Sequence, residues 1–185
     1  CETYEHESET DSRLRYGENP HQKAVLEPNQ KNNSWLKASL LQGKEMSFNN
    51  YVDADAAWSM VKDLPANSVV IIKHTNPSGA AFATKQRQEN KDIFLAALEC
   101  DPISSFGGII AINGNLDEAT AAEISKNFYE VVIADVVDPA AKTILAKKKN
   151  LRIIEFPAWE AERKQIKSLS TGDLLIQDFD SGITE

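Results

Sequence analysis

Residues 69–81 read VVIIKHTNPSGAA, which joins a strand pattern to a pair of chemically active side chains. The β-branched run at 69–72 is long enough for a buried strand and too short for a typical helix. Lys73 and His74 follow it directly, and the NPSG sequence at 76–79 is typical of a turn. We therefore predict a buried strand over 69–73 that ends at a Lys–His pair, and a turn after it that could open a helix.

Strand and helix patterns alternate on both sides of this stretch. A helix is predicted to start with Asp53 as its N-cap and to end before Pro65. The alternation predicts an α/β layered fold with a mixed, at least partly parallel sheet. The expected helices cover residues 53–64, 91–100, 117–129 and 138–150, and the further expected strands cover 106–113, 130–134, 151–156 and 172–178.

The composition is that of a globular protein with an acidic surface. The chain has 185 residues, of which 42% are hydrophobic and 26% charged, and its net charge is −8. This length can bury a core as one compact domain. The negative charge argues against nucleic acid as a partner, but a few local cations could still bind a small anion. No apolar run approaches the roughly 20 residues of a membrane span, so we expect no membrane contact.

The cysteine content and the start of the chain bear on its setting. Cys1 and Cys100 show no C-x-x-C spacing, so a structural zinc or thioredoxin-type site is not expected. Two cysteines and no signal peptide favour a reducing, cytoplasmic location. Residues 1–12 are polar and are predicted to be a disordered or linker segment. Because the chain lacks an initiator Met, we expect a piece of a longer protein.

The Lys73–His74 pair is the first candidate site. Ligands in α/β sheets tend to bind beyond the carboxyl ends of parallel strands, and we expect the pair to lie at such an end. A Lys supplies a compact cation and a His a tunable acid or base, which suits proton transfer near an anion. The alternative is a solvated lysine beside a histidine that only packs against the turn.

Other segments carry weaker signals. The DPISSFGG stretch at 101–108 has hydroxyls and glycines that would allow close approach of a ligand, but it also suits a plain helix-to-strand turn. Arg15 could clamp a phosphate and Tyr16 could stack or donate a hydrogen bond, unless the two belong to an ordinary ordered loop. Asn50 precedes the expected helix, where an entry role is the simpler explanation.

The order of the motifs reveals a family resemblance. Together they resemble the transformylase domain of the purine-biosynthesis bienzymes, which combine aminoimidazole carboxamide ribonucleotide transformylase with inosine monophosphate cyclohydrolase. The resemblance runs from residue 13 to about residue 180. The motifs, in chain order, are LRYGENPHQ, LQGKEMSFNNYVDADAAW, VVIIKHTNPSGAA, DPISSFGGIIAIN, EVVIA and KSLSTGDLLIQDFD.

The resemblance implies a reaction, a fold and a set of site residues. The reaction is formyl transfer from 10-formyltetrahydrofolate to the 5-amino group of the ribonucleotide. The fold is a three-layer α/β/α sandwich like that of cytidine deaminases, and the parent protein is a homodimer. By motif match the proton acceptor is His74 and the transition-state stabiliser Lys73, while the nucleotide is bound by Arg15, Tyr16, Asn50, Ser105, Phe106, Gly107 and Glu130.

The resemblance also implies what the chain lacks. Residues 13–185 match the first half of the transformylase domain, so the cyclohydrolase domain and the second transformylase half are expected to be absent. We therefore expect little or no activity from this chain alone, and the alternative is a nucleotide-binding half-domain without catalysis. The H-x-E and P-C-x-x-C ligands of zinc deaminases are missing, so no metal is expected.

Overall fold

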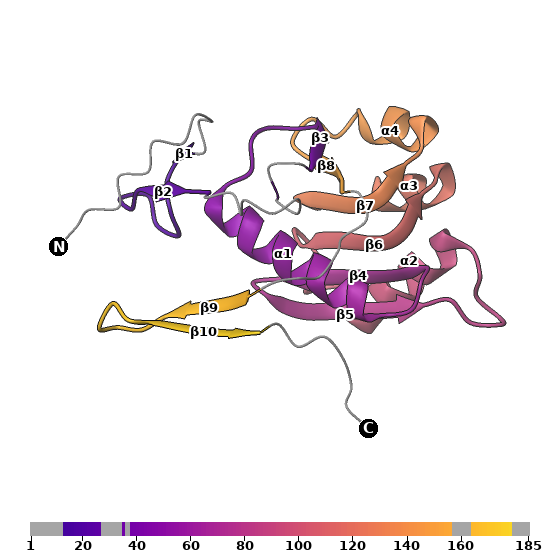
Figure 1. Ribbon diagram of the computed structural model, residues 1–185. Coiled ribbons are helices and arrows are strands. Elements are labelled where there is room, and N and C mark those ends of the chain that lie inside the picture. Colours follow the sequence, from indigo (N-terminus) through magenta and orange to yellow (C-terminus); the bar gives the residue numbers. More distant parts are fainter. Residues whose placement is uncertain (1–12, 27–34, 36–37, 157–163, 179–185) are drawn as a thin grey trace, which may run out of the picture.

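A computed structural model describes residues 13–26, 35, 38–156 and 164–178; the segment 1–12, predicted as disordered or a linker, lies outside them. Six strands form one central sheet in the order β3-β8-β7-β6-β4-β5 (Figure 1). Strands β6, β7 and β8 are parallel, whereas β3, at one edge, and β4 run antiparallel to their neighbours. The prediction of an α/β fold with a mixed sheet is confirmed. The strands are β3 (Ser39–Gln42), β4 (Ser68–Lys73), β5 (Asn76–Phe82), β6 (Ile109–Leu116), β7 (Val131–Val137) and β8 (Arg152–Glu155).

Helices cover both faces of the sheet, because successive side chains of the buried strands point to opposite sides. In β4, Val70 and Ile72 pack toward α1, whereas Val69 and Ile71 pack toward α2, α3 and α4. Figure 1 shows the same division, which makes the fold an α/β sandwich. The helices are α1 (Phe48–Asp63), α2 (Asn90–Cys100), α3 (Glu118–Ile124) and α4 (Pro139–Leu145).

The segment after the Lys–His pair differs from the prediction. Residues 76–79 open no helix, since they begin β5, which pairs antiparallel with β4 from Ser68 opposite Phe82 to Lys73 opposite Asn76. The turn is therefore only His74-Thr75, two residues earlier than predicted. A two-residue connection forces an antiparallel hairpin, whereas a helix would have required a crossover to a parallel strand.

Helix α1 begins earlier than predicted and two helices end earlier. The N-cap of α1 is Ser47, not Asp53, because Ser47 and Asn50 form a reciprocal capping box. The chain leaves α3 after Ile124 and α4 after Leu145, where turns lead back to the next strand. The predicted helices 117–129 and 138–150 were therefore too long.

Two small hairpins lie outside the central sheet. One pairs β1 (Arg13–Leu14) with β2 (Ala24–Val25), and the other pairs β9 (Lys164–Ser168) with β10 (Leu174–Asp178). The strand predicted over 172–178 is confirmed as β10, but β9 was missed because its KQIKS sequence is mostly polar. Every residue of β9 and β10 is exposed. Among the described residues, no helix has the length and apolar character needed to cross a membrane.

We expect Gly79→Ala to destabilise the fold strongly. A Cβ at Gly79 would lie 1.9 Å from the carbonyl oxygen of Ala97 in α2, and a backbone atom cannot swing away as a side chain can. The free energy of unfolding should fall by about 3 kcal/mol, as measured by urea denaturation. Gly172→Ala is the control, since a Cβ there meets nothing within 4 Å and strains only a turn with positive φ. Equal stability of the two variants would contradict the close packing of β5 against α2.

Candidate functional site

The candidate side chains gather where the parallel strands begin. Ile72 pairs with Ile109, Ile109 with Val131, and Val131 with Arg152, so these positions lie in one row across β4, β6, β7 and β8. Because β4 is antiparallel to β6, its carboxyl end meets the amino ends of its neighbours. Our expectation that the Lys–His pair lies beyond the carboxyl ends of parallel strands was therefore wrong.

A cavity of about 600 Å³ opens at this edge. It brings together all the predicted site residues except Ser105 and Phe106. Cations and carboxylates share its wall, so the site is polar and mixed in charge rather than a simple anion pocket. The residues that line it are Arg15, Tyr16, Glu18, Ser47, Asn49, Asn50, Val52, Asp53, Lys73, His74, Thr75, Gly107, Ile109, Glu130 and Arg152.

The turn between β4 and β5 has a strained backbone. His74 has φ 53° and Thr75 has φ 59°, both in the left-handed region. This conformation costs an L-residue roughly 1–2 kcal/mol, and it is a true outlier for a β-branched residue such as Thr75. Two-residue hairpins with positive φ at both positions usually carry Asn-Gly or Asp-Gly instead. The His74-Thr75 turn departs from this preference beside a cavity, and strained backbone of this kind is typical of functional sites.

Side chains satisfy the polar groups of the turn. The carboxylate of Asp53 accepts hydrogen bonds from the backbone N–H groups of His74 (3.2 Å) and Thr75 (2.8 Å). The Thr75 hydroxyl and the Asn76 amide both donate to the carbonyl oxygen of His74, each at 2.7 Å. These bonds hold an exposed turn in one conformation and direct the His74 ring to the cavity.

Lys73 is fixed by the neighbouring loop. Its Nζ donates a hydrogen bond of 2.7 Å to the carbonyl oxygen of Phe106. The ammonium group has three protons, and this bond uses one. The other two can serve an anion or a developing negative charge in the cavity.

Asn50 and Glu130 form another part of the cavity wall. Asn50 is 6% exposed, and its Nδ2 donates to Glu130 Oε2 at 2.7 Å. Its Oδ1 accepts from the Ser47 backbone N–H (3.2 Å) and hydroxyl (2.9 Å), so the amide orientation is settled by its partners. Asn50 therefore both caps the start of helix α1, as considered from the sequence, and lines the cavity.

The predicted Arg–Tyr pair sits on a compact loop. The Gly17 N–H donates to the Gln22 carbonyl oxygen at 2.7 Å, and the Gln22 side chain accepts from the Asn19 backbone N–H at 2.8 Å. The Arg15 guanidinium lies 5.7 Å from the centre of the Tyr16 ring. The ordered-loop alternative is thus correct for the backbone, while both side chains face the cavity.

The Ser105–Gly107 loop supports the site mainly through its backbone. Ser105 is 2% exposed, and its hydroxyl donates to the Pro102 carbonyl oxygen at 2.9 Å, so this side chain stabilises the loop. The ring of Phe106 is 58% exposed and stands 5.5 Å from that of Phe128. Gly107 has φ +75°, and its N–H donates to the carbonyl oxygen of Phe128. Within the described residues, the carbonyl oxygen of Gly107 accepts no hydrogen bond, so it can serve a ligand.

Asp101 anchors the start of this loop. Its Oδ1 accepts from the backbone N–H groups of Ile103 (3.2 Å) and Ser104 (2.9 Å). Hydrogen bonds from the Ser104 side chain, and then from its backbone, hold the pKa of Asp101 below the ordinary value. The charged carboxylate is therefore the form that stabilises the loop.

Sequence reasoning missed several residues of the cavity, above all Asp53 and Arg152. Asp53 looked like a helix cap, and nothing in the sequence shows which backbone groups it meets. Arg152 is the first residue of β8, and its Nε donates to the carbonyl oxygens of Lys44 (3.1 Å) and Glu45 (3.2 Å). Its terminal nitrogens make no hydrogen bond within the described part of the chain. The missed signal was an arginine at the start of a strand whose two central residues are buried and apolar.

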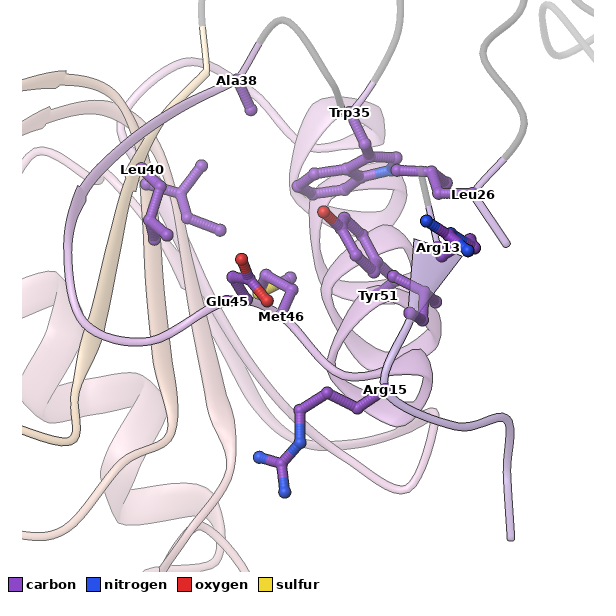
Figure 2. A pocket seen from close by; sticks show the side chains of 11 residues that line it. Arg13, Arg15, Leu26, Trp35, Ala38, Leu40, Glu45, Met46 and Tyr51 are labelled. Atoms are coloured by element: carbon purple, nitrogen blue, oxygen red, sulfur yellow. The ribbon is translucent and has the colours of Figure 1, made fainter. Parts of the chain in front are cut away.

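A smaller cavity of about 190 Å³ adjoins the site through Arg15. Figure 2 shows its aromatic wall of Trp35 and Tyr51, with the Arg15 guanidinium pointing away from both rings. Burial, and then the negative charge of Glu45, raise the pKa of Tyr51, so its phenol stays neutral near pH 7. Aromatic, aliphatic and charged side chains together line this cavity.

Within residues 13–26, 35, 38–156 and 164–178, no three His, Cys, Asp or Glu side chains are arranged to hold a metal ion. Asp53, the carboxylate nearest to the His74 turn, is engaged by two backbone N–H groups. That no metal takes part in the reaction stays a prediction.

Comparisons with known proteins identify relatives over nearly the whole chain. The family model described as AICARFT/IMPCHase bienzyme matches residues 2–185. The bifunctional purine biosynthesis protein PurH of Aquifex aeolicus (strain VF5) is 46% identical over 175 residues, which cover 94% of this chain and 33% of that protein. The protein of the same name from Prochlorococcus marinus (strain MIT 9211) is 45% identical over 185 residues, which cover 93% of this chain and 35% of that protein. The chain spans about a third of the length of the curated relatives it matches.

We expect Asn50→Asp to make stability depend on pH. An aspartate at this position can still accept from Ser47, but it places a second carboxylate against Glu130. Repulsion raises the pKa of one of the two in the folded state. The variant should therefore match the wild type near pH 4 and lose stability as pH rises toward 8, as followed by its thermal midpoint.

Asn49→Asp is the matched control, because Asn49 is exposed on the same helix turn and only its 3.5 Å bond to the Glu18 carbonyl oxygen changes. A parallel pH profile for the two variants would mean that the contact between Asn50 and Glu130 has no energetic role.

We expect acid to loosen the loop that begins at Asp101. The pKa of Asp101 is lower in the folded state than in the unfolded state, so its stabilisation is fully present above the unfolded pKa and is lost as pH falls through the folded pKa. As the pH falls through this pKa, hydrogen exchange of the backbone amides of Ile103 and Ser104 should accelerate, after correction for the intrinsic dependence of exchange on pH. Asp101→Asn should show the faster exchange already at pH 7, and unchanged exchange in that variant would disprove the anchoring role.

Proposed function

Since the chain belongs to the AICARFT/IMPCHase bienzyme family, we propose that it builds the nucleotide side of a formyl-transfer site in purine biosynthesis. Family membership confirms the resemblance inferred from the motifs. The substrates would be aminoimidazole carboxamide ribonucleotide and 10-formyltetrahydrofolate. The observation that carries the proposal is the single cavity in which Lys73 and His74 meet Arg15, Tyr16 and Asn50.

His74 is proposed as the general base. The exocyclic amine of the ribonucleotide is conjugated with its ring and is a poor nucleophile. It forms the new N–C bond to the formyl carbon as it loses a proton, and a base within hydrogen-bond reach lowers that barrier. An exposed imidazole on a fixed turn can accept this proton. The bond between the formyl carbon and the folate nitrogen then breaks, and that nitrogen leaves with a proton.

Lys73 is proposed to stabilise the oxyanion. Attack on the formyl carbon turns its carbonyl oxygen into an alkoxide, and a pre-oriented cation lowers the energy of that state. The bond from Nζ to the Phe106 carbonyl oxygen supports this role, because it fixes the ammonium group before substrate arrives. A freely rotating lysine would have to lose that freedom during the reaction.

The arginines are proposed to hold the nucleotide. Arg15 carries a planar guanidinium that suits a phosphate, and Tyr16 beside it can stack or donate a hydrogen bond. Arg152 adds a second guanidinium to the same cavity. Glu130 and the carbonyl oxygen of Gly107 can accept hydrogen bonds from the ribose or the carboxamide.

The proposal concerns a protein longer than this chain. We propose that the second transformylase half and a second subunit complete the folate side, and that the protein works in the cytoplasm as a homodimer. The alternative is a half-domain that binds the nucleotide without catalysis. Calorimetric titration of this chain with the ribonucleotide tests that alternative, and an absence of binding would mean that the site needs the second transformylase half or the dimer partner.

We expect His74→Ala and Lys73→Ala to abolish most formyl transfer. Loss of a positioned general base typically lowers kcat by about 10²–10⁴-fold, and loss of an oxyanion donor by about 10²–10³-fold. The assay follows tetrahydrofolate release by the full-length protein. Lys85→Ala, an exposed lysine outside the cavity, should keep the wild-type rate. Near-normal transfer by His74→Ala would eliminate the proposed role of the pair.

A further inference from the structure

The turn that carries His74 depends on another element for its stability. His74 and Thr75 both have positive φ, and neither is a glycine. Two of the hydrogen bonds on this turn come from Thr75 and Asn76, which belong to the turn or follow it directly. The bonds to Asp53 are different, because they join the turn to helix α1 across 21 and 22 residues of sequence.

The Asp53 carboxylate fits the turn with both oxygens. Oδ2 accepts from the N–H of His74 and Oδ1 from the N–H of Thr75. Two adjacent N–H groups point to one side because both residues are left-handed. Hydrogen bonds to an ionised acceptor are stronger than neutral ones, so this pair of bonds can offset the strain of the turn.

Helix α1 connects the turn to a second part of the cavity wall. Asn50 and Asp53 are three residues apart, so they lie on the same side of the helix. Asn50 binds Glu130, directly before β7, and Asp53 binds the turn at the end of β4. The first turns of α1 therefore set the separation between Glu130 and the Lys73–His74 pair.

We propose that Asp53 is a positioning residue for the Lys73–His74 pair. This inference rests on the proposed function and adds to it a residue that acts through the backbone of the turn. Asp53 does not exchange a proton with substrate. It holds His74 and Thr75 in the left-handed conformation, and this conformation directs the imidazole and the ammonium group into the cavity.

The test compares Asp53→Ala and Asp53→Asn in the full-length protein. Misplacement of a catalytic group by about 1 Å can lower the rate by about 100-fold, and we expect that loss in kcat for Asp53→Ala, with little change in KM for the ribonucleotide. Asp53→Asn keeps one acceptor oxygen, so its kcat should fall less than that of Asp53→Ala. Asp63→Asn is the matched control, since it makes the same charge change on an exposed position of the same helix.

A second variant distinguishes positioning from a direct role. Thr75→Gly removes the steric penalty of the left-handed conformation, because glycine adopts positive φ freely. It also removes the Thr75 hydroxyl bond to the carbonyl oxygen of His74, so the effect of Asp53→Ala is compared within each background. Asp53→Ala should lower kcat less in the Thr75→Gly background than in the wild-type background. An equal or larger loss of kcat in the Thr75→Gly background would overturn the proposal, because strain in the turn would then not be what Asp53 offsets.

An activity-independent measurement completes the test. In this chain, amide exchange at His74 and Thr75 should accelerate in Asp53→Ala and stay slow in Asp63→Asn. A loss of kcat without faster exchange would mean that Asp53 acts on the substrate directly. Faster exchange with unchanged kcat would mean that the turn conformation does not matter. If the wild-type protein transfers no formyl group, the proposed function fails, and the exchange rates alone decide whether Asp53 holds the turn.

Discussion

Strand β4 runs antiparallel to β6 from Ser68, opposite Asn113, to Ile72, opposite Ile109. The location of the site depends on this pairing. A parallel β4 would place Lys73 at the far edge of the sheet, away from the amino ends of β7 and β8. The antiparallel arrangement instead brings the end of one strand to the beginning of three others. Both faces of the pairing are buried under helices, so a shift of its register by one residue would exchange the side chains of two packed layers and disturb both.

The most regular and the least regular parts of the molecule meet at one point. The buried residues of β4 are β-branched and suit a strand, whereas the two residues after Lys73 are not those that a two-residue turn with positive φ usually contains. Such a conflict persists only where surrounding contacts determine the conformation. Here Asp53 and the hydroxyl of Thr75 provide those contacts. Precise placement of the imidazole thus depends on the core on one side and on a few polar bonds on the other.

The buried strands and the residue types of the site could be read from the sequence, because β-branched runs and rare motifs carry local information. The hairpin could not, since His-Thr is an unusual sequence for a two-residue turn. The early start of α1 was missed because Ser47 and Asn50 resemble loop residues until their capping box is seen. Contacts between distant segments, such as Asp53 with the turn, leave no pattern in a single sequence. The roles assigned to individual site residues stay predictions.

The close approach of Gly79 to Ala97 has a consequence for how this segment can vary. Between Ile71 and Ile72 the pairing of β4 with β5 shifts, and Ser78 is the extra residue that the ladder already accommodates. One more inserted residue would exchange the two faces of β5 and turn a side chain, in place of Gly79, against α2. The stretch from Lys73 to Gly79 should therefore be free of insertions and deletions among homologues, because its length decides which residue of β5 meets α2.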